Sequence, residues 1–97
     1  MKVVLAAEAA RRLESQIGYL RDVGAEHAAE WLRARLTTFL AHHLAHYPRT
    51  GRRLGNRDLR EMWVPRTRLV VWYRIEEEQI LVVTVWHTSQ GRSVAKP

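Results

Sequence analysis

The 97-residue sequence contains no cysteine, three prolines and five glycines. The absence of cysteine excludes disulfides, thiolate metal ligands and a cysteine nucleophile, and it is typical of proteins from a reducing compartment. Long apolar runs are also missing, because charged residues soon interrupt the apolar opening at residues 1–7. That opening is too short for a signal-peptide core or a membrane span. We therefore expect a cytoplasmic protein that does not enter a membrane.

Lysine is almost absent from a basic sequence. Fourteen of the sixteen basic residues are arginine, and the formal net charge is +6. Residues 47–74 hold eight arginines and two acidic residues, whereas the two signs nearly balance in residues 1–46. Because arginine makes bidentate contacts with phosphates and carboxylates, segment 47–74 suits a polyanion or an acidic protein partner. A solvated surface that only adds solubility is the alternative.

The first half of the chain has the periodicity of helices. A composition of 46% hydrophobic and 27% charged residues predicts one globular domain over residues 1–97. Residues 3–5 form a short β-branched run that predicts a first strand. Apolar residues then recur every three or four positions in two segments, about 6–22 and 25–47, separated by Gly24. So short a link predicts an antiparallel helical hairpin.

The second half has the pattern of strands. After turn-forming residues 50–56, three extended segments at 59–64, 68–75 and 80–86 predict an antiparallel meander. The predicted fold class is α+β, in which an N-terminal strand and an antiparallel helical hairpin pack on a small antiparallel sheet in the order β-α-α-β-β-β. Both sheet faces carry apolar residues and one hairpin covers only one of them, so we expect a protein partner on the other. Residues 88–97 are expected to form a flexible tail.

Three histidines near the end of the second helix are the most visible candidate for a metal site. His42 and His46 are one helical turn apart, and His43 lies between them. No fourth ligand follows nearby, and no His-Glu-x-x-His motif occurs. We therefore predict no metal site and no cofactor.

A second group of residues has the chemistry of phosphodiester cleavage. Arg60 and Arg68 would hold phosphate, and His87 would transfer a proton near neutral pH, with Tyr73 nearby. An obvious carboxylate base is missing. The alternative is structural, with Arg60 in ion pairs, Tyr73 in the core and His87 at a strand end.

Four segments, in this order, resemble the RelE/ParE toxin family of type II toxin-antitoxin systems. They are residues 6–13 (AAEAARRL), 47–52 (YPRTGR), 58–65 (DLREMWVP), and the paired strands 68–75 (RLVVWYRI) and 80–87 (ILVVTVWH). The Pro-x-x-Gly helix ending, the Leu-Arg strand and the final histidine are most similar to the ParE branch.

The resemblance implies a small bacterial toxin that a cognate antitoxin neutralises within a hetero-oligomer. The ParE branch implies inhibition of DNA gyrase by protein contact, without catalytic chemistry. The RelE branch implies cleavage of mRNA on the ribosome, and Arg60, Arg68 and His87 are the positions that match its catalytic residues. We favour the ParE branch because the acidic base of some RelE members has no counterpart here.

The contact residues for the antitoxin or the target are expected among large aromatics and arginines, the usual anchors of interfaces. In the family the antitoxin usually lays a helix or strand over the sheet and the hairpin. The candidate contacts are Trp63, Arg66, Arg68, Trp72, Tyr73, Arg74, Trp86 and Arg92.

Overall fold

A computed structural model describes residues 1–88 of the chain. Its elements, in order, are β1 (Lys2–Leu5), α1 (Ala7–Asp22), α2 (Glu26–Thr38), a π-helical segment η1 (Phe39–Leu44), β2 (Arg52–Arg53), β3 (Arg60–Trp63), β4 (Leu69–Ile75) and β5 (Gln79–His87). The candidate contact Arg92, and the predicted tail apart from Thr88, lie outside the described residues. No helix within residues 1–88 has both the length and the apolarity needed to cross a membrane.

The five strands form one sheet in the order β1-β5-β4-β3-β2. The meander β3-β4-β5 is antiparallel, as predicted. The sheet as a whole is mixed, however, because β1 runs parallel to β5, with Val3 opposite Ile80. The helical hairpin between β1 and the rest of the chain supplies the crossover that a parallel pair needs. Strand β2, which sequence periodicity does not reveal, adds two residues to the other edge.

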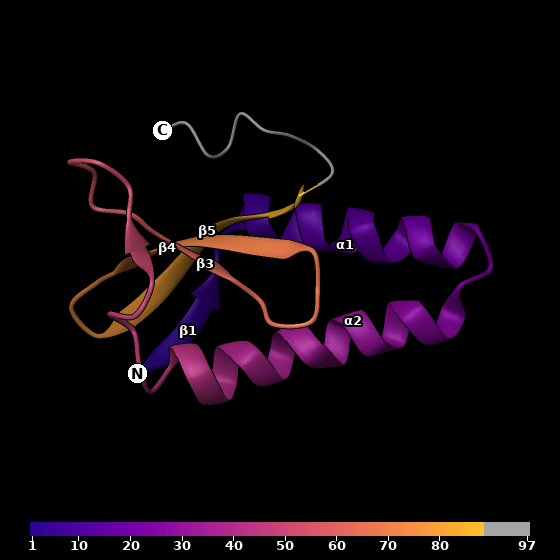
Figure 1. Ribbon diagram of the computed structural model, residues 1–97, viewed down its shortest axis with the longest axis horizontal. Helices are drawn as coiled ribbons and strands as arrows, with labels where there is room; N and C mark the ends of the chain where they lie inside the picture. Colours follow the sequence, from indigo (N-terminus) through magenta and orange to yellow (C-terminus); the bar gives the residue numbers. More distant parts are fainter. Residues whose placement is uncertain (89–97) are drawn as a thin grey trace.

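The two helices form the predicted antiparallel hairpin (Figure 1). Gly24 lies in the link with a φ of 82°, a left-handed conformation that glycine adopts without steric cost. The second helix departs from the prediction, since the α-helix ends at Thr38 and residues up to Leu44 form the wider π-helical segment. Phe39, Leu40 and Leu44 of that segment are all buried, so the widened turn brings three neighbouring side chains to the core.

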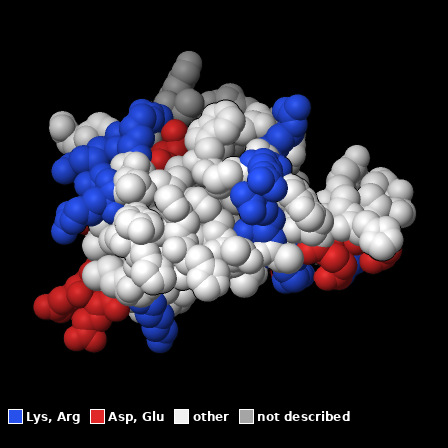
Figure 2. All heavy atoms as spheres, turned by 60° about the horizontal axis from the view of Figure 1, so that its bottom comes forward, with Lys and Arg blue, Asp and Glu red and all other residues white. Residues whose placement is uncertain are grey.

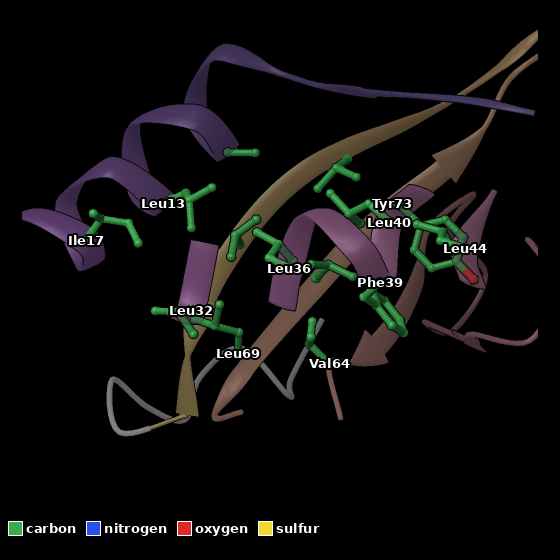
Figure 3. Packing of buried hydrophobic residues seen from close by; sticks show 14 of the residues in the cluster. Leu13, Ile17, Leu32, Leu36, Phe39, Leu40, Leu44, Val64, Leu69 and Tyr73 are labelled. Carbon is green, nitrogen blue, oxygen red and sulfur yellow. The ribbon is translucent and has the colours of Figure 1, made fainter. Parts of the chain in front are cut away.

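The hydrophobic core lies between the hairpin and one face of the sheet (Figure 3). Leu13 and Ile17 of α1 and Leu32 and Leu36 of α2 face the sheet, in keeping with their helical spacing. The sheet contributes Leu69, Val71 and Tyr73 from β4 and Ile80, Val82 and Val85 from β5.

A β-bulge in β5 changes which residues face the core. Tyr73 is opposite Val82, but the preceding Trp72 is opposite Thr84, which leaves Val83 without a partner in register. A regular strand over the predicted segment 80–86 would place residues 80, 82, 84 and 86 on one face, but beyond Val82 the next core residue is Val85. A bulge inserts one extra residue and so reverses the alternation after it.

Candidate functional site

An open groove lies between the tip of the helical hairpin and the turn that joins β3 to β4. Its volume is about 1020 Å³, and it is lined by Ser15, Gln16, Tyr19, Leu20, Ala28, Trp31, Leu32, Trp63, Arg66, Thr67, Arg68, His87 and Thr88. Three of its aromatic side chains are largely open to solvent, since Tyr19 is 63%, Trp31 48% and Trp63 61% exposed. Exposed aromatics gathered in one depression mark an interaction site.

The β3-β4 turn that forms one wall of the groove is held in place by side chains. Arg35 Nε of α2 donates a hydrogen bond to the Pro65 carbonyl at 3.0 Å, and Thr67 Oγ1 donates to the Val64 carbonyl at 2.7 Å. Arg66 has a φ of 67°, which is uncommon for a residue other than glycine. These contacts fix a turn that carries a candidate contact arginine.

Arg68 and His87 lie side by side at this end of the sheet. His87 is opposite Leu69, and the Thr88 amide donates to the Arg68 carbonyl at 2.8 Å. Burial, followed by the nearby Arg68 charge, lowers the pKa of His87, so its imidazole is neutral at pH 7. Among the described lining residues there is no aspartate or glutamate. The groove thus offers arginines and a neutral imidazole, but no carboxylate base.

Arg60 and Tyr73 lie at the opposite end of the sheet, where they hold the chain after η1. The buried Tyr73 hydroxyl donates to the Pro48 carbonyl at 2.7 Å and accepts from the Gly51 amide at 2.9 Å. Arg60 Nη1 donates to the carbonyls of Arg49 (3.1 Å) and Gly51 (2.9 Å). Burial raises the pKa of Tyr73, so the hydroxyl keeps its proton. In the part of the chain that the structure describes, Arg60 therefore has a structural role through backbone carbonyls and forms no ion pair.

The structure separates the residues that the sequence suggested as a phosphodiester-cleaving group, namely Arg60, Arg68, Tyr73 and His87. Arg60 pairs with Tyr73, whereas Arg68 precedes Leu69, the partner of His87. The four-residue step from Leu69 to Tyr73 corresponds to about 13 Å along the strand. The fold brings Arg68 and His87 together at one end of the sheet and places Arg60 at the other end.

The sheet face away from the helices carries a buried carboxylate that sequence analysis missed. Glu61 is 7% exposed and accepts hydrogen bonds from Trp72 Nε1 at 2.9 Å and from Arg52 Nη2 at 2.7 Å. In the sequence, the only indication of this carboxylate is that Glu61 is the single acidic residue inside the predicted strand 59–64. Trp72 is thus half-buried and already hydrogen-bonded.

Trp86, another candidate contact on this face, is 7% exposed and pairs with Val70 across the strands. Its indole N–H finds no acceptor in the described part of the chain. Of the three candidate tryptophans, only Trp63 is therefore fully available to a partner.

A second, smaller pocket of about 190 Å³ lies at the Tyr73 end of the sheet. It is lined by Arg49, Arg53, Arg57, Asp58, Leu59, Arg60, Tyr73, Arg74 and Ile75. The candidate contact Arg74 belongs to this pocket, where its Nη2 is 3.2 Å from Glu76 Oε2. Figure 2 shows basic side chains gathered at this end of the molecule, on the left of the view.

The helix-end histidines make packing and backbone contacts. His43 stacks on Phe39 at 5.2 Å between ring centroids, and His46 Nδ1 lies 3.1 Å from the His42 carbonyl oxygen. Within residues 1–88, no three histidine, aspartate or glutamate side chains converge to hold a metal ion.

Comparison with known proteins identifies the family. The model of the family described as "ParE toxin of type II toxin-antitoxin system, parDE" matches residues 3–91. The chain belongs to this ParE toxin family. It is therefore the toxin of a type II toxin-antitoxin system, which implies an antitoxin partner, and the ParE branch favoured from sequence is confirmed.

A solved structure confirms the α+β fold of this ParE family member. The chain is similar to one from the "Chromosomal ParDE TA system from P. aeruginosa", with a TM-score of 0.73 and 13% sequence identity over 90% of this chain and 95% of that one. No curated protein sequence matches the chain.

Proposed function

We propose that the toxin inhibits DNA gyrase by direct protein contact and has no catalytic chemistry of its own. The observation that supports this most is the division of the nuclease candidates, since Arg60 is bound to two backbone carbonyls about 13 Å along the sheet from His87. General acid-base catalysis needs its groups within hydrogen-bonding reach of the same bond. The arrangement suits recognition better than cleavage.

The groove is the proposed contact surface. Trp63 and Trp31 offer large apolar areas, and Arg66 and Arg68 offer cations beside them. Tryptophan and arginine supply most of the energy in many interfaces when they are buried against a partner. We place the antitoxin over the same groove, so that neutralisation follows because the bound antitoxin covers the surface that meets gyrase.

The test is inhibition of purified gyrase by the full-length toxin, read as loss of plasmid supercoiling and gain of cleaved DNA. We expect Trp63→Ala to weaken inhibition by about tenfold or more, the scale for losing an aromatic anchor. Tyr47→Ala is the matched control, because Tyr47 is 58% exposed but does not line the groove. If both variants inhibited gyrase equally, the groove would not be the contact surface. If the wild-type toxin did not inhibit gyrase, gyrase would not be its target.

A second candidate function is cleavage of mRNA on the ribosome, which the juxtaposition of Arg68 and His87 in the groove favours. His87→Ala separates the two functions. It should weaken gyrase inhibition less than Trp63→Ala does, because His87 is only partly exposed in the groove, whereas a nuclease would lose roughly 100-fold or more in cleavage.

Pulse labelling after induction of the toxin without antitoxin gives an independent answer. An early fall in DNA synthesis supports gyrase, and an early fall in protein synthesis supports cleavage on the ribosome.

A further inference from the structure

Two arginines face each other in the β2-β3 pair. The register places Arg53 directly opposite Arg60, where like charges destabilise a sheet. Arg60 donates only to backbone carbonyls, and within residues 1–88 Arg53 has no carboxylate partner. The neighbouring Arg52 shows the contrast, since its guanidinium is paired with Glu61 on the other face. Within residues 1–88, the Arg53-Arg60 pair is therefore a local electrostatic cost that no ion pair with a carboxylate offsets.

Arg53 and Arg60 both line the smaller pocket, where three further arginines add to the positive charge. Five of its lining residues are arginines, and Asp58 is its single carboxylate among the described residues. Arg74 is paired with Glu76 just outside, whereas Arg49 and Arg57, like Arg53, make no ion pair in the part of the chain that the structure describes. Residues that break a local rule of protein structure without visible compensation are often found at functional sites.

The backbone that carries these arginines makes its own hydrogen bonds. Leu54 is fully buried, its amide donates to the Leu59 carbonyl at 3.1 Å, and the Arg57 amide donates to the Leu54 carbonyl at 3.1 Å. Gly55 supplies the left-handed turn between them, with a φ of 60°. Arg60 is fixed from the other side by its two carbonyl acceptors. The loop therefore presents its arginines from a defined conformation, which lowers the entropic cost of binding an anion.

We propose that this pocket binds a phosphodiester group of a nucleic-acid backbone. The planar guanidinium matches two phosphate oxygens at once, which explains arginine in place of lysine. The pocket is too small for a helix but suits one phosphate group. A nucleic-acid backbone is favoured over an acidic protein segment because it carries a charge on every nucleotide, so phosphates next to the one in the pocket can contact the other arginines around it. The site is at the opposite end of β4 from the groove and does not depend on the identity of the toxin's protein target.

The test is fluorescence anisotropy of labelled duplex DNA and single-stranded RNA with the full-length toxin. The pocket variant is Arg53→Ala/Arg57→Ala, two exposed side chains without ion pairs in the described structure. The control is Arg11→Ala/Arg12→Ala, which removes the same charge from the exposed surface of α1. Titrations at about 50 mM and about 200 mM salt give the salt dependence for each protein.

We expect the pocket variant to bind at least about tenfold more weakly than the control variant and to lower the salt slope by about two. A stronger effect with DNA or with RNA identifies which nucleic acid supplies the phosphate. Equal losses in the two variants would overturn the proposal, since binding would then depend on net charge alone. Unchanged nucleic-acid binding with weakened antitoxin binding would also overturn it and would assign the pocket to an acidic protein segment. Arg57→Glu, a single change in the exposed loop, repeats the comparison if the double variant unfolds.

Discussion

The two ends of β4 use the same kinds of residue for different purposes. At the Tyr73 end, the hydroxyl and the Arg60 guanidinium satisfy backbone groups of the segment after η1. At the Leu69 end, Arg68 and Trp63 line an open groove. An arginine thus holds backbone carbonyls at one end of the sheet and is an available cation at the other. The role of each arginine depends on whether backbone carbonyls that lack another donor lie within reach of its guanidinium group.

The largest expected effect tests how tightly the Tyr73 end is packed. A Cβ added at Gly51 would overlap the Tyr73 hydroxyl and approach Cε1 and Cζ of the same ring. Gly51→Ala must therefore displace a fully buried ring and break its hydrogen bond, and we expect a loss of about 3 kcal/mol in the free energy of unfolding. Chemical denaturation of the purified toxin measures this loss.

Gly18→Ala is the matched control for that measurement. Nothing lies within 4 Å of a Cβ at Gly18, which is in the interior of α1. Alanine favours a helix over glycine, so this variant should gain about 0.5 to 1 kcal/mol. A loss at Gly18 similar to that at Gly51 would mean that the Tyr73 end is not specially packed.

The next effect isolates the tyrosine hydroxyl. Tyr73→Phe keeps the ring but leaves the Pro48 carbonyl and the Gly51 amide without their partner. A buried polar group that loses its hydrogen bond costs about 1 to 3 kcal/mol, so we expect a loss of about 2 kcal/mol by denaturation. A variant as stable as the wild type would show that water replaces the hydroxyl, and the contrast between the two ends would then weaken.

The arrangement of elements could be predicted because it depends on periodicity. Helical spacing in residues 6–22 and the alternation of the last three strands specify a hairpin on a meander. The parallel pairing of β1 with β5 could not be predicted, because a four-residue strand with three apolar residues suits either edge and either direction. The bulge at Val83 was also beyond sequence reasoning, since both of its possible faces are apolar.

The candidate site was predicted only in part, and for a related reason. Sequence analysis identified residue types suited to phosphate or protein contact, and Trp63, Arg66, Arg68 and His87 do share a groove. It could not place Arg60 away from them, because that depends on the register of three strands. The carboxylate of Glu61 was missed because its partners, Arg52 and Trp72, come from two different strands.

A smaller effect is expected between the two ends, at the buried Glu61. Arg52→Ala leaves this carboxylate with only the Trp72 indole as hydrogen-bond donor among the side-chain contacts. Arg52 is largely exposed, so solvent screens the ion pair and we expect a loss of only about 1 kcal/mol in unfolding free energy. Salt titration checks the assignment, because added salt should narrow the difference between wild type and variant. A salt-independent difference would indicate lost packing in place of lost charge.

The smallest effect concerns pH and tests the groove end. Burial and Arg68 hold the pKa of His87 below its ordinary value of 6.5, so below that pH the unfolded chain takes up a proton that the folded chain resists. Stability contributed by the neutral imidazole is therefore complete above about pH 6.5 and is lost as the pH falls through the folded pKa. His87→Gln should flatten this part of the pH profile of unfolding free energy. If His87→Gln kept the wild-type slope, the imidazole would not be held neutral in the groove, and its environment would resemble solvent more than the buried Tyr73 end.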